Sequence, residues 1–399
     1  MTASVLFYVQ HLLGIGHLQR ALHIAEALVA DGIAVTLVSG GAPVDLPRDR
    51  SIDLVQLTPV RAHDARFELV DSAERPIDDA LREARREALL AAFTRTRPDA
   101  VIIEGFPFAR RAFRFELEPL IAAVRAATPR PRLLCSVRDI VVMRDDPQRH
   151  REIVERVRRD FDAVLVHGDP ALVRLDSSFP AAPDIADRVI YTGYVRPPVA
   201  PAGAAAATGG GEVVVSAGGG AAGHALLKAA LGARRSGCLA GLPWRLLTGT
   251  NLPDADFAAL GKGLPDRVVV ERFCYNFVGL LQGCRVSVSQ AGYNTVLDIL
   301  AARARAVVVP FAAGRETEQP MRAERLAALG AVEVVREDEL SPRRLAAAIK
   351  RALSREPATV ALDTGGAVSS ARLIGAMIRP PKPSAGGSAA ASSRGIIAQ

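Results

Sequence analysis

The sequence SQAGYNTVLD, residues 289–298, joins a short apolar run to a helical pattern. The run Val286–Ser289 predicts a buried strand, and Gly292 and Thr295 stand where the following helix begins. The first amides of a helix can hold phosphate oxygens. A strand, a glycine turn and a helix in this order form the repeating unit of parallel α/β sheets. The stretch therefore predicts a doubly wound sheet with an anion site at the carboxyl end of this strand.

The same alternation continues in both directions from this unit. Helical patterns separate the apolar runs, for example Leu18–Ala30, which ends at Gly32. The predicted strands of the first half are Val5–Val9, Val35–Ser39, Ala100–Ile103, Leu133–Val137, Ala163–His167 and Val189–Thr192. Those of the second half are Glu212–Ser216, Trp244–Thr248, Val268–Arg272, Val286–Ser289, Ala306–Pro310 and Val332–Val335. This alternation predicts two parallel sheets, each covered by helices on both faces.

Shifts in composition mark the expected domain boundaries. Residues 197–211 are rich in Pro, Ala and Gly without a core-forming pattern, so they predict a linker. We therefore expect an N-terminal Rossmann-like domain over residues 1–196 and a second one over 212–379. Residues 380–399 are rich in Pro, Gly, Ser and Ala and predict a disordered tail. Two such domains facing each other place a cleft between the carboxyl ends of their sheets, where ligands bind.

Composition argues against several classes of protein. The chain has 399 residues, 49% of them hydrophobic, with a formal net charge of +7 and a pI of about 9.6. Its arginines alternate with acids in segments such as 82–87, which favours solvated helix faces over a nucleic-acid surface. The four cysteines form no CxxC pair, so they predict free thiols. The sequence shows neither a basic leader nor a long apolar stretch, which predicts a cytoplasmic protein without a membrane span.

A glycine turn after the first predicted strand holds the first candidate site. Gly14 and Gly16 flank Ile15, and His17 follows in the first turn of the next helix. The helix dipole disfavours a charged imidazole there, so His17 is a candidate general base. A plain helix start is an equal alternative. Glu104 and Asp139 follow two other strands as candidate groups that assist the base or bind the acceptor, and a structural role suits them equally well.

A second glycine turn follows the first strand of the second half. Ser216 precedes Gly218–Gly220, whose backbone can form a cradle for a diphosphate. No Gly-Lys-Ser/Thr follows, which argues against a P-loop nucleotidase. The Asp-x-Asp pair at residues 254–256 stands at an expected helix start, so we expect no metal there.

Several features of the second half occur together and carry a resemblance. An Ala-Gly-x-Asn-Thr turn starts at Ala291, Asp298 follows three residues after its Thr, and Glu318-Gln319 lies in a loop after a Val-Val-Val-Pro strand end. In these features the sequence resembles glycosyltransferase family 28, which includes the peptidoglycan N-acetylglucosaminyltransferase. It resembles even more closely a group of bacterial predicted glycosyltransferases. The resemblance is strong over about residues 280–335 and looser around both glycine turns.

The resemblance implies a GT-B fold, in which two Rossmann-like domains face each other across a cleft, and a UDP-sugar donor. It implies that Asp298 bonds the ribose hydroxyls, where the family usually has Glu, and that Gln319 bonds the sugar. The backbone of residues 273–275 would bind the edge of uracil. With the two glycine turns, the expected donor-binding residues are Gly14, Gly16, Ser216, Gly218, Gly219, Gly220, Phe273, Cys274, Tyr275, Ala291, Gly292, Asn294, Thr295, Asp298, Glu318 and Gln319.

The function predicted from these motifs is transfer of a hexose or N-acetylhexosamine from a UDP-sugar to an acceptor hydroxyl. We expect an inverting reaction without a metal or another cofactor. The alternatives are a UDP-sugar epimerase or hydrolase on the same fold, and a sugar-nucleotide-binding protein without activity. The basic segment 110–115 is compatible with a lipid-linked acceptor or with contact to the inner membrane face, and an amphipathic surface helix is the simpler alternative.

Overall fold

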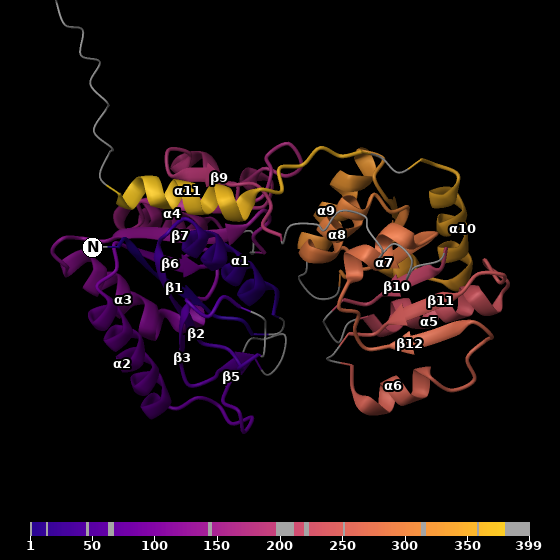
Figure 1. Ribbon diagram of the computed structural model, residues 1–399, viewed down its shortest axis with the longest axis horizontal. Helices are drawn as coiled ribbons and strands as arrows, with labels where there is room; N and C mark the ends of the chain where they lie inside the picture. The colour runs from indigo at the N-terminus through magenta and orange to yellow at the C-terminus, as the bar shows by residue number, and fades with distance from the viewer. Residues whose placement is uncertain are drawn as a thin grey trace, which may run out of the picture.

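The computed structural model describes residues 2–12, 15–44, 48–62, 68–142, 146–196, 211–218, 223–249, 252–312, 317–356 and 359–379. Their helices and strands form two lobes (Figure 1). Residues 197–210 of the expected linker and the expected tail at 380–399 lie outside the described residues. Gly14, Gly219 and Gly220 lie outside them as well.

The first lobe is built on a seven-stranded sheet with the order β3-β2-β1-β6-β7-β8-β9. All neighbouring strands in it pair in parallel. The strands are β1 (Ser4–Val9), β2 (Ala34–Ser39), β3 (Asp53–Gln56), β6 (Ala100–Glu104), β7 (Arg132–Arg138), β8 (Ala163–His167) and β9 (Val189–Tyr191). The order reverses between β1 and β6, and doubly wound sheets bind ligands at such a point.

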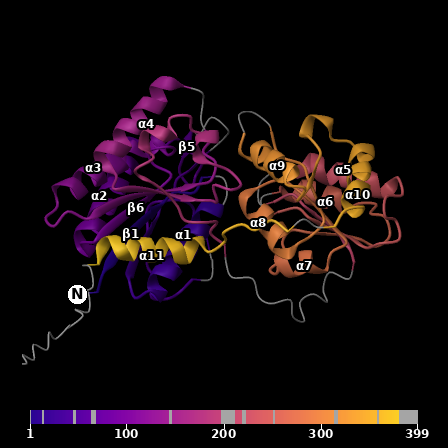
Figure 2. The ribbon, with the colours of Figure 1, turned by 90° about the horizontal axis from the view of Figure 1, so that it is seen from above.

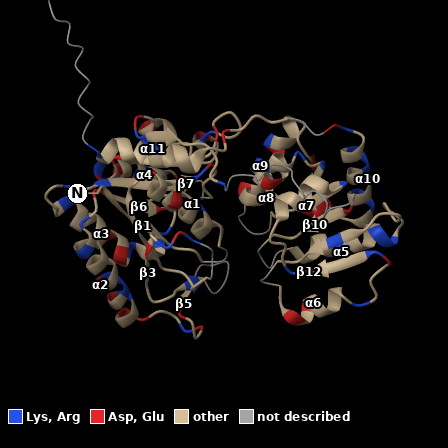
Figure 3. Cartoon of the chain, viewed as in Figure 1, with Lys and Arg blue, Asp and Glu red and all other residues tan. Residues whose placement is uncertain are grey.

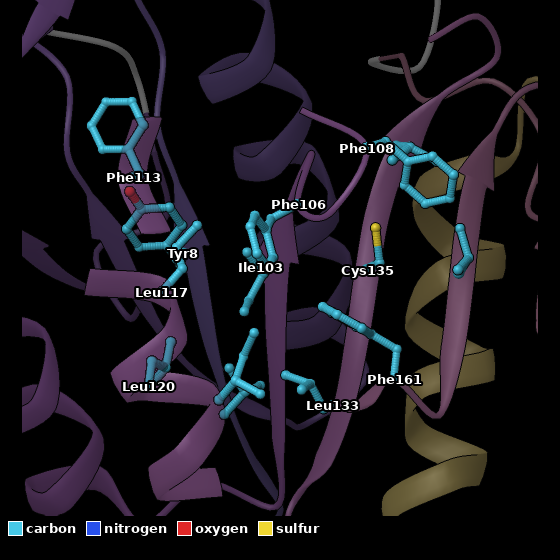
Figure 4. Packing of buried hydrophobic residues seen from close by; sticks show 14 of the residues in the cluster. Tyr8, Ile103, Phe106, Phe108, Phe113, Leu117, Leu120, Leu133, Cys135 and Phe161 are labelled. Atoms are coloured by element: carbon cyan, nitrogen blue, oxygen red, sulfur yellow. The ribbon is translucent and has the colours of Figure 1, made fainter. Parts of the chain in front are cut away.

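Helices cover both faces of this sheet because its strands are apolar on both sides. In β1, Leu6 and Tyr8 pack with α2 and α3, while Val5, Phe7 and Val9 pack with α1, as the two-residue period of a strand requires. Figure 4 shows part of the first of these clusters. The helices are α1 (Gly16–Ala30), α2 (Asp79–Thr96), α3 (Arg114–Ala126) and α4 (Pro147–Asp160), with a small antiparallel pair of β4 (Arg61–Ala62) and β5 (Leu69–Val70).

The second lobe repeats the plan with a six-stranded parallel sheet of order β12-β11-β10-β13-β14-β15. Its strands are β10 (Val213–Ser216), β11 (Trp244–Leu247), β12 (Val268–Glu271), β13 (Val286–Ser289), β14 (Ala306–Val308) and β15 (Glu333–Val334). Its helices are α5 (His224–Arg235), α6 (Asp254–Leu260), α7 (Phe277–Gly283), α8 (Tyr293–Ala302), α9 (Glu318–Ala328) and α10 (Pro342–Leu353). The order reverses between β10 and β13, the strands that precede the two predicted phosphate cradles.

The last helix, α11 (Gly366–Ile378), returns to the first lobe and lies beside α1 (Figures 1 and 2). Ala371 and Ile374 of α11 join the apolar cluster under α1, and Arg379 forms an ion pair with Asp31 at 2.9 Å. The sequence-based division assigned this helix to the second domain, 212–379. The structure packs it on the first, because its apolar face matches that of α1.

Charged side chains of both signs are interspersed over the helices of both lobes (Figure 3). On α2, for example, Arg82 pairs with Asp79 and Arg86 pairs with Glu83. This is the surface expected from the mixed charge pattern of the sequence. Within the described part of the chain, no helix combines the length and the apolar character needed to cross a membrane.

Candidate active site

The carboxyl ends of β1 and β6 bring His17 and Glu104 together. His17 is the second residue of α1, and Glu104 is the last residue of β6. The His17 Nδ1 atom lies 2.6 Å from Glu104 Oε1. Because the sheet order reverses between these two strands, the pair stands at the ligand-binding edge of the first sheet. Two of the three predicted catalytic residues are thus hydrogen-bonded partners.

Two arginines hold the carboxylate of Glu104, which is 2% exposed. Arg20 Nη2 donates to Oε1 at 2.7 Å, and Arg110 Nη2 donates to Oε2 at 3.3 Å. Burial acts to raise the pKa of Glu104, but His17 and the guanidinium groups of Arg110 and Arg20 outweigh it and hold the pKa well below its ordinary value. Glu104 is therefore an anion at neutral pH and can only accept hydrogen bonds.

The imidazole of His17 is neutral at physiological pH. Burial of this side chain, of which 24% is exposed, lowers its pKa to about 3 and outweighs the opposing effect of Glu104. An unprotonated ring nitrogen would repel a carboxylate oxygen at 2.6 Å, so Nδ1 carries the proton and donates a hydrogen bond to Glu104. The other nitrogen, Nε2, then keeps its lone pair. This is the tautomer that a general base requires.

For Asp139 the structure favours the structural role, one of the two alternatives that the sequence left open. Its carboxylate is fully buried and accepts from Arg322 Nη2 at 2.8 Å and from Tyr194 Oη at 3.1 Å. Arg322 belongs to α9 of the second lobe, so this ion pair crosses between the domains. Its oxygens face protein donors rather than the cleft. We therefore assign Asp139 to the interdomain contact and not to the chemistry.

Glu318 and Gln319 begin α9 beside this ion pair. Arg322 Nη2 donates to Glu318 Oε1 at 2.9 Å, and Arg138 of the first lobe lies 2.7 Å from Oε2. The Oε1 atom of Gln319 accepts from the backbone amides of Ala291 and Phe311, each at 3.1 Å. These bonds fix the orientation of the Gln319 amide at the carboxyl ends of β13 and β14.

The switch point of the second sheet carries the predicted phosphate cradle. Ser216 ends β10, and Gly218 adopts a φ of +69°, a conformation that favours glycine. Gly292 is the N-cap residue of α8 and, as a glycine, has no side chain that could cap the first amides of this helix, which are therefore candidates for an anion site. Ala291 is buried behind the turn, while Asn294 is exposed and Thr295 half-buried in the first turn itself.

This predicted cradle lies close to the start of α1, which carries His17 in the other lobe. The first turn of α1 approaches the first turn of α8: a side-chain carbon on Gly16 would lie 3.5 Å from Asn294 Nδ2. That same nitrogen donates to Gln19 Oε1 at 3.4 Å. The two predicted sites, one in each lobe, therefore lie next to each other.

Asp298 lies about one turn after Thr295 on α8, and its side chain is half-buried. Burial raises its pKa to about 6, and the charge of Arg196 only partly opposes this shift. Phe273, Cys274 and Tyr275 lie at the carboxyl end of β12, the edge strand that pairs with β11. The Phe273 and Tyr275 rings are exposed and meet edge to face at 5.1 Å.

Four residues of the site were missed from the sequence: Arg20, Arg110, Tyr293 and Arg322. Arg20, Tyr293 and Arg322 each contact a group far away in the chain, and no motif marks such a contact, while Arg110 contacts Glu104 six positions before it. One signal was present for Arg20, which follows His17 by three residues and so lies on the same face of the helix.

The architecture is that of GT-B proteins: two doubly wound domains with a site between their switch points. It is similar to that of the calicheamicin glycosyltransferase CalG4, with a TM-score of 0.59, 18% identity, and coverage of 95% of this chain and 94% of that one. It is also similar to Acinetobacter baumannii MurG, with a TM-score of 0.57, 17% identity, and coverage of 93% of this chain and 95% of that one.

Residues 214–372, which include most of the second lobe, match the model of the glycosyltransferase family 28 C-terminal domain. A stretch of 91 residues is 36% identical to the UDP-N-acetylglucosamine--N-acetylmuramyl-(pentapeptide) pyrophosphoryl-undecaprenol N-acetylglucosamine transferase of Brucella anthropi. That stretch covers 22% of this chain and 24% of the relative.

Proposed function

We propose that the protein transfers a sugar from a UDP-sugar to an acceptor hydroxyl, with inversion and without a metal. The observation that carries the proposal is the His17–Glu104 pair at the edge of the first sheet, opposite the uncapped start of α8. The acceptor hydroxyl gives its proton to Nε2 of His17, while Glu104 keeps Nδ1 protonated and stabilises the imidazolium that forms.

The second lobe supplies the leaving-group site in this proposal. The diphosphate of the donor lies against the first amides of α8 and the turn after β10, which stabilise the charge that develops as the bond to the sugar breaks. The acceptor oxygen attacks from the side of the first lobe, opposite the departing diphosphate. Attack from the face opposite the leaving group inverts the anomeric carbon.

An epimerase or hydrolase would place extra carboxylates around the anomeric carbon, and Glu104 and Asp139 were the candidates. The Glu104 carboxylate is bound to His17 and two arginines. Since Asp139 is buried and bound to Arg322, we favour transfer.

For the acceptor we propose a lipid-linked, phosphate-bearing molecule. The name of the Brucella relative specifies such an acceptor for that protein. In the first lobe, Arg114 and Arg149 share Glu152 as a partner, and Arg111 adds a further positive charge near Arg149.

The proposal predicts that UDP-sugars raise the melting temperature and that GDP- and dTDP-sugars do so less. Binding to the native state at about 100 Kd adds roughly 2.7 kcal/mol of stability. The measurement is a thermal-shift panel, followed by incubation with the best donor alone and then with lipid-phosphate acceptors. Rapid UDP release or epimerisation without an acceptor would favour the alternative enzymes, and binding without turnover would favour a sensor.

Donor affinity is predicted to fall on acidification because Asp298 has a pKa of about 6. The ribose hydroxyls prefer the ionised carboxylate, which loses its charge as pH falls through that value. At pH 5 roughly a tenth of it is ionised, so we expect the Kd for a UDP-sugar to be about tenfold weaker than at pH 7.5. Calorimetric titration measures this. Asp298→Asn should bind weakly at both pH values, and a wild-type Kd that stays constant would contradict the role of Asp298.

A further inference from the structure

Tyr293, the first residue of α8, is held by the backbone of the other lobe. Its hydroxyl donates to the carbonyl oxygen of His167 at 3.0 Å and accepts from the amide of Val195 at 3.2 Å. The ring packs against Tyr194, with the centroids 5.5 Å apart. All three of these partners belong to the first lobe, while α8 carries the proposed diphosphate cradle in the second. Tyr293 is buried, so its contacts are made within the protein.

Two buried arginines share the ring of Tyr293. The guanidinium carbon of Arg20 lies 5.8 Å from the ring centroid, and that of Arg322 lies 5.6 Å from it. Arg20 also donates to Glu104, the partner of His17, at 2.7 Å. Arg322 donates to Asp139 at 2.8 Å and so ties α9 to the first lobe. The Tyr293 ring thus contacts both Arg20, which binds the Glu104 carboxylate, and Arg322, which joins the domains.

We propose that Tyr293 is a positioning residue that sets the distance and angle between the diphosphate cradle and the His17–Glu104 pair. The inference deepens the proposed function and rests on it. The cradle and the base belong to different domains, so their relative placement depends on interdomain contacts. Tyr293 is the residue of the cradle helix that reaches the first lobe by hydrogen bonds to backbone atoms that cannot change rotamer. Misplacing reacting groups by about 1 Å can slow a reaction about 100-fold.

The decisive variant is Tyr293→Phe, which keeps the ring contacts and removes both hydroxyl bonds. We expect the kcat of sugar transfer to fall about tenfold, which is what loss of one or two net hydrogen bonds in the transition state produces. The donor Kd should change less than twofold, because no donor contact is removed. Tyr293→Leu also removes the ring and should lower kcat further. Should Tyr293→Leu fail to fold, Tyr293→Phe alone decides the matter.

The matched control is Tyr191→Phe. The hydroxyl of Tyr191 likewise accepts from a backbone amide, that of Leu175 at 2.7 Å, but both residues lie in the first lobe. A merely structural role for a tyrosine hydroxyl would give both variants the same kinetic effect. The inference requires Tyr293→Phe to lower kcat and Tyr191→Phe to leave it unchanged. Equal effects of the two variants, or a loss confined to donor affinity, would overturn it.

A second readout does not depend on catalysis. The amide of Val195 donates to Tyr293, so hydrogen exchange in a peptide that covers residues 193–196 should accelerate in Tyr293→Phe and not in Tyr191→Phe. Unchanged exchange there would overturn the inference even with kcat reduced. If the wild type transfers no sugar to any acceptor, the proposed function fails, and the exchange measurement still decides whether Tyr293 fixes the domain contact.

Discussion

Replacing His17 by Ala is expected to lower the kcat of sugar transfer by about 10²–10⁴-fold, the range in which positioned general bases act. The substitution removes the lone pair on Nε2 and leaves Glu104 with its two arginine partners. Donor affinity should stay close to that of the wild type, because the contacts proposed for the nucleotide and the diphosphate lie in the second lobe and the substitution leaves the backbone of Gly16 in place. The measurement is kcat at saturating donor beside the donor Kd from calorimetry.

The matched control for this substitution is His23→Ala. His23 lies on the same helix, α1, and pairs with Glu26 at the surface at 3.3 Å, so its loss should leave kcat unchanged. Because the pKa of His17 is about 3, kcat in the wild type should stay level from pH 8 to pH 5 instead of falling near 6.5. Loss of donor binding with unchanged kcat in His17→Ala would remove His17 from the role of base.

Replacing Arg85 by Met should lower the free energy of unfolding by about 3–5 kcal/mol, the usual cost of leaving one buried charge without its partner. Arg85 and Glu116 are both fully buried, and Arg85 Nε and Nη2 each donate to the Glu116 carboxylate at 2.8 Å. Arg85 also donates to the carbonyl oxygen of Gly40 at 2.9 Å, which ties the loop after β2 to α2. The measurement is chemical denaturation followed by far-UV circular dichroism.

The control and the compensating variant lie on the same elements. Arg82, one turn earlier on α2, pairs with Asp79 at the surface, and Arg82→Met should change stability by less than about 1 kcal/mol. The double variant Arg85→Met with Glu116→Leu should recover most of the loss, because neither charge then remains in the core. An Arg85→Met protein as stable as Arg82→Met would show that the buried pair contributes nothing.

Much of the fold follows from the sequence because parallel strands buried on both faces are recognisable as apolar runs. The runs at β1, β6 and β13 are of this kind, and the structure confirms them. Asp53–Gln56 was missed, because β3 is an edge strand with exposed and polar residues. The docking of α11 was missed for another reason: an amphipathic helix shows that one face is buried, and does not show against which domain.

The candidate site, like the fold, could be predicted where local sequence determines it and not where contacts between distant residues do. His17 and Glu104 could be predicted because His17 lies in the first turn of the helix that follows β1, Glu104 ends β6, and the carboxyl ends of neighbouring parallel strands meet. Asp139 also follows a strand, but its side chain turns into the interface to meet Arg322, 183 positions away. A local pattern carries no information on such a contact. The sequence places Tyr293 in the glycine turn, but only the structure shows that it contacts His167 and Val195.

The return of α11 to the first lobe has a consequence for biosynthesis. Residues 2–196 leave the ribosome with the apolar flank of α1 uncovered, since Ala371 and Ile374, which pack beneath it, are encoded about 170 residues later. At roughly 5–20 residues per second this interval lasts on the order of 10–30 s. Until α11 has been synthesised, the apolar residues of α1 that it covers therefore lack their partner.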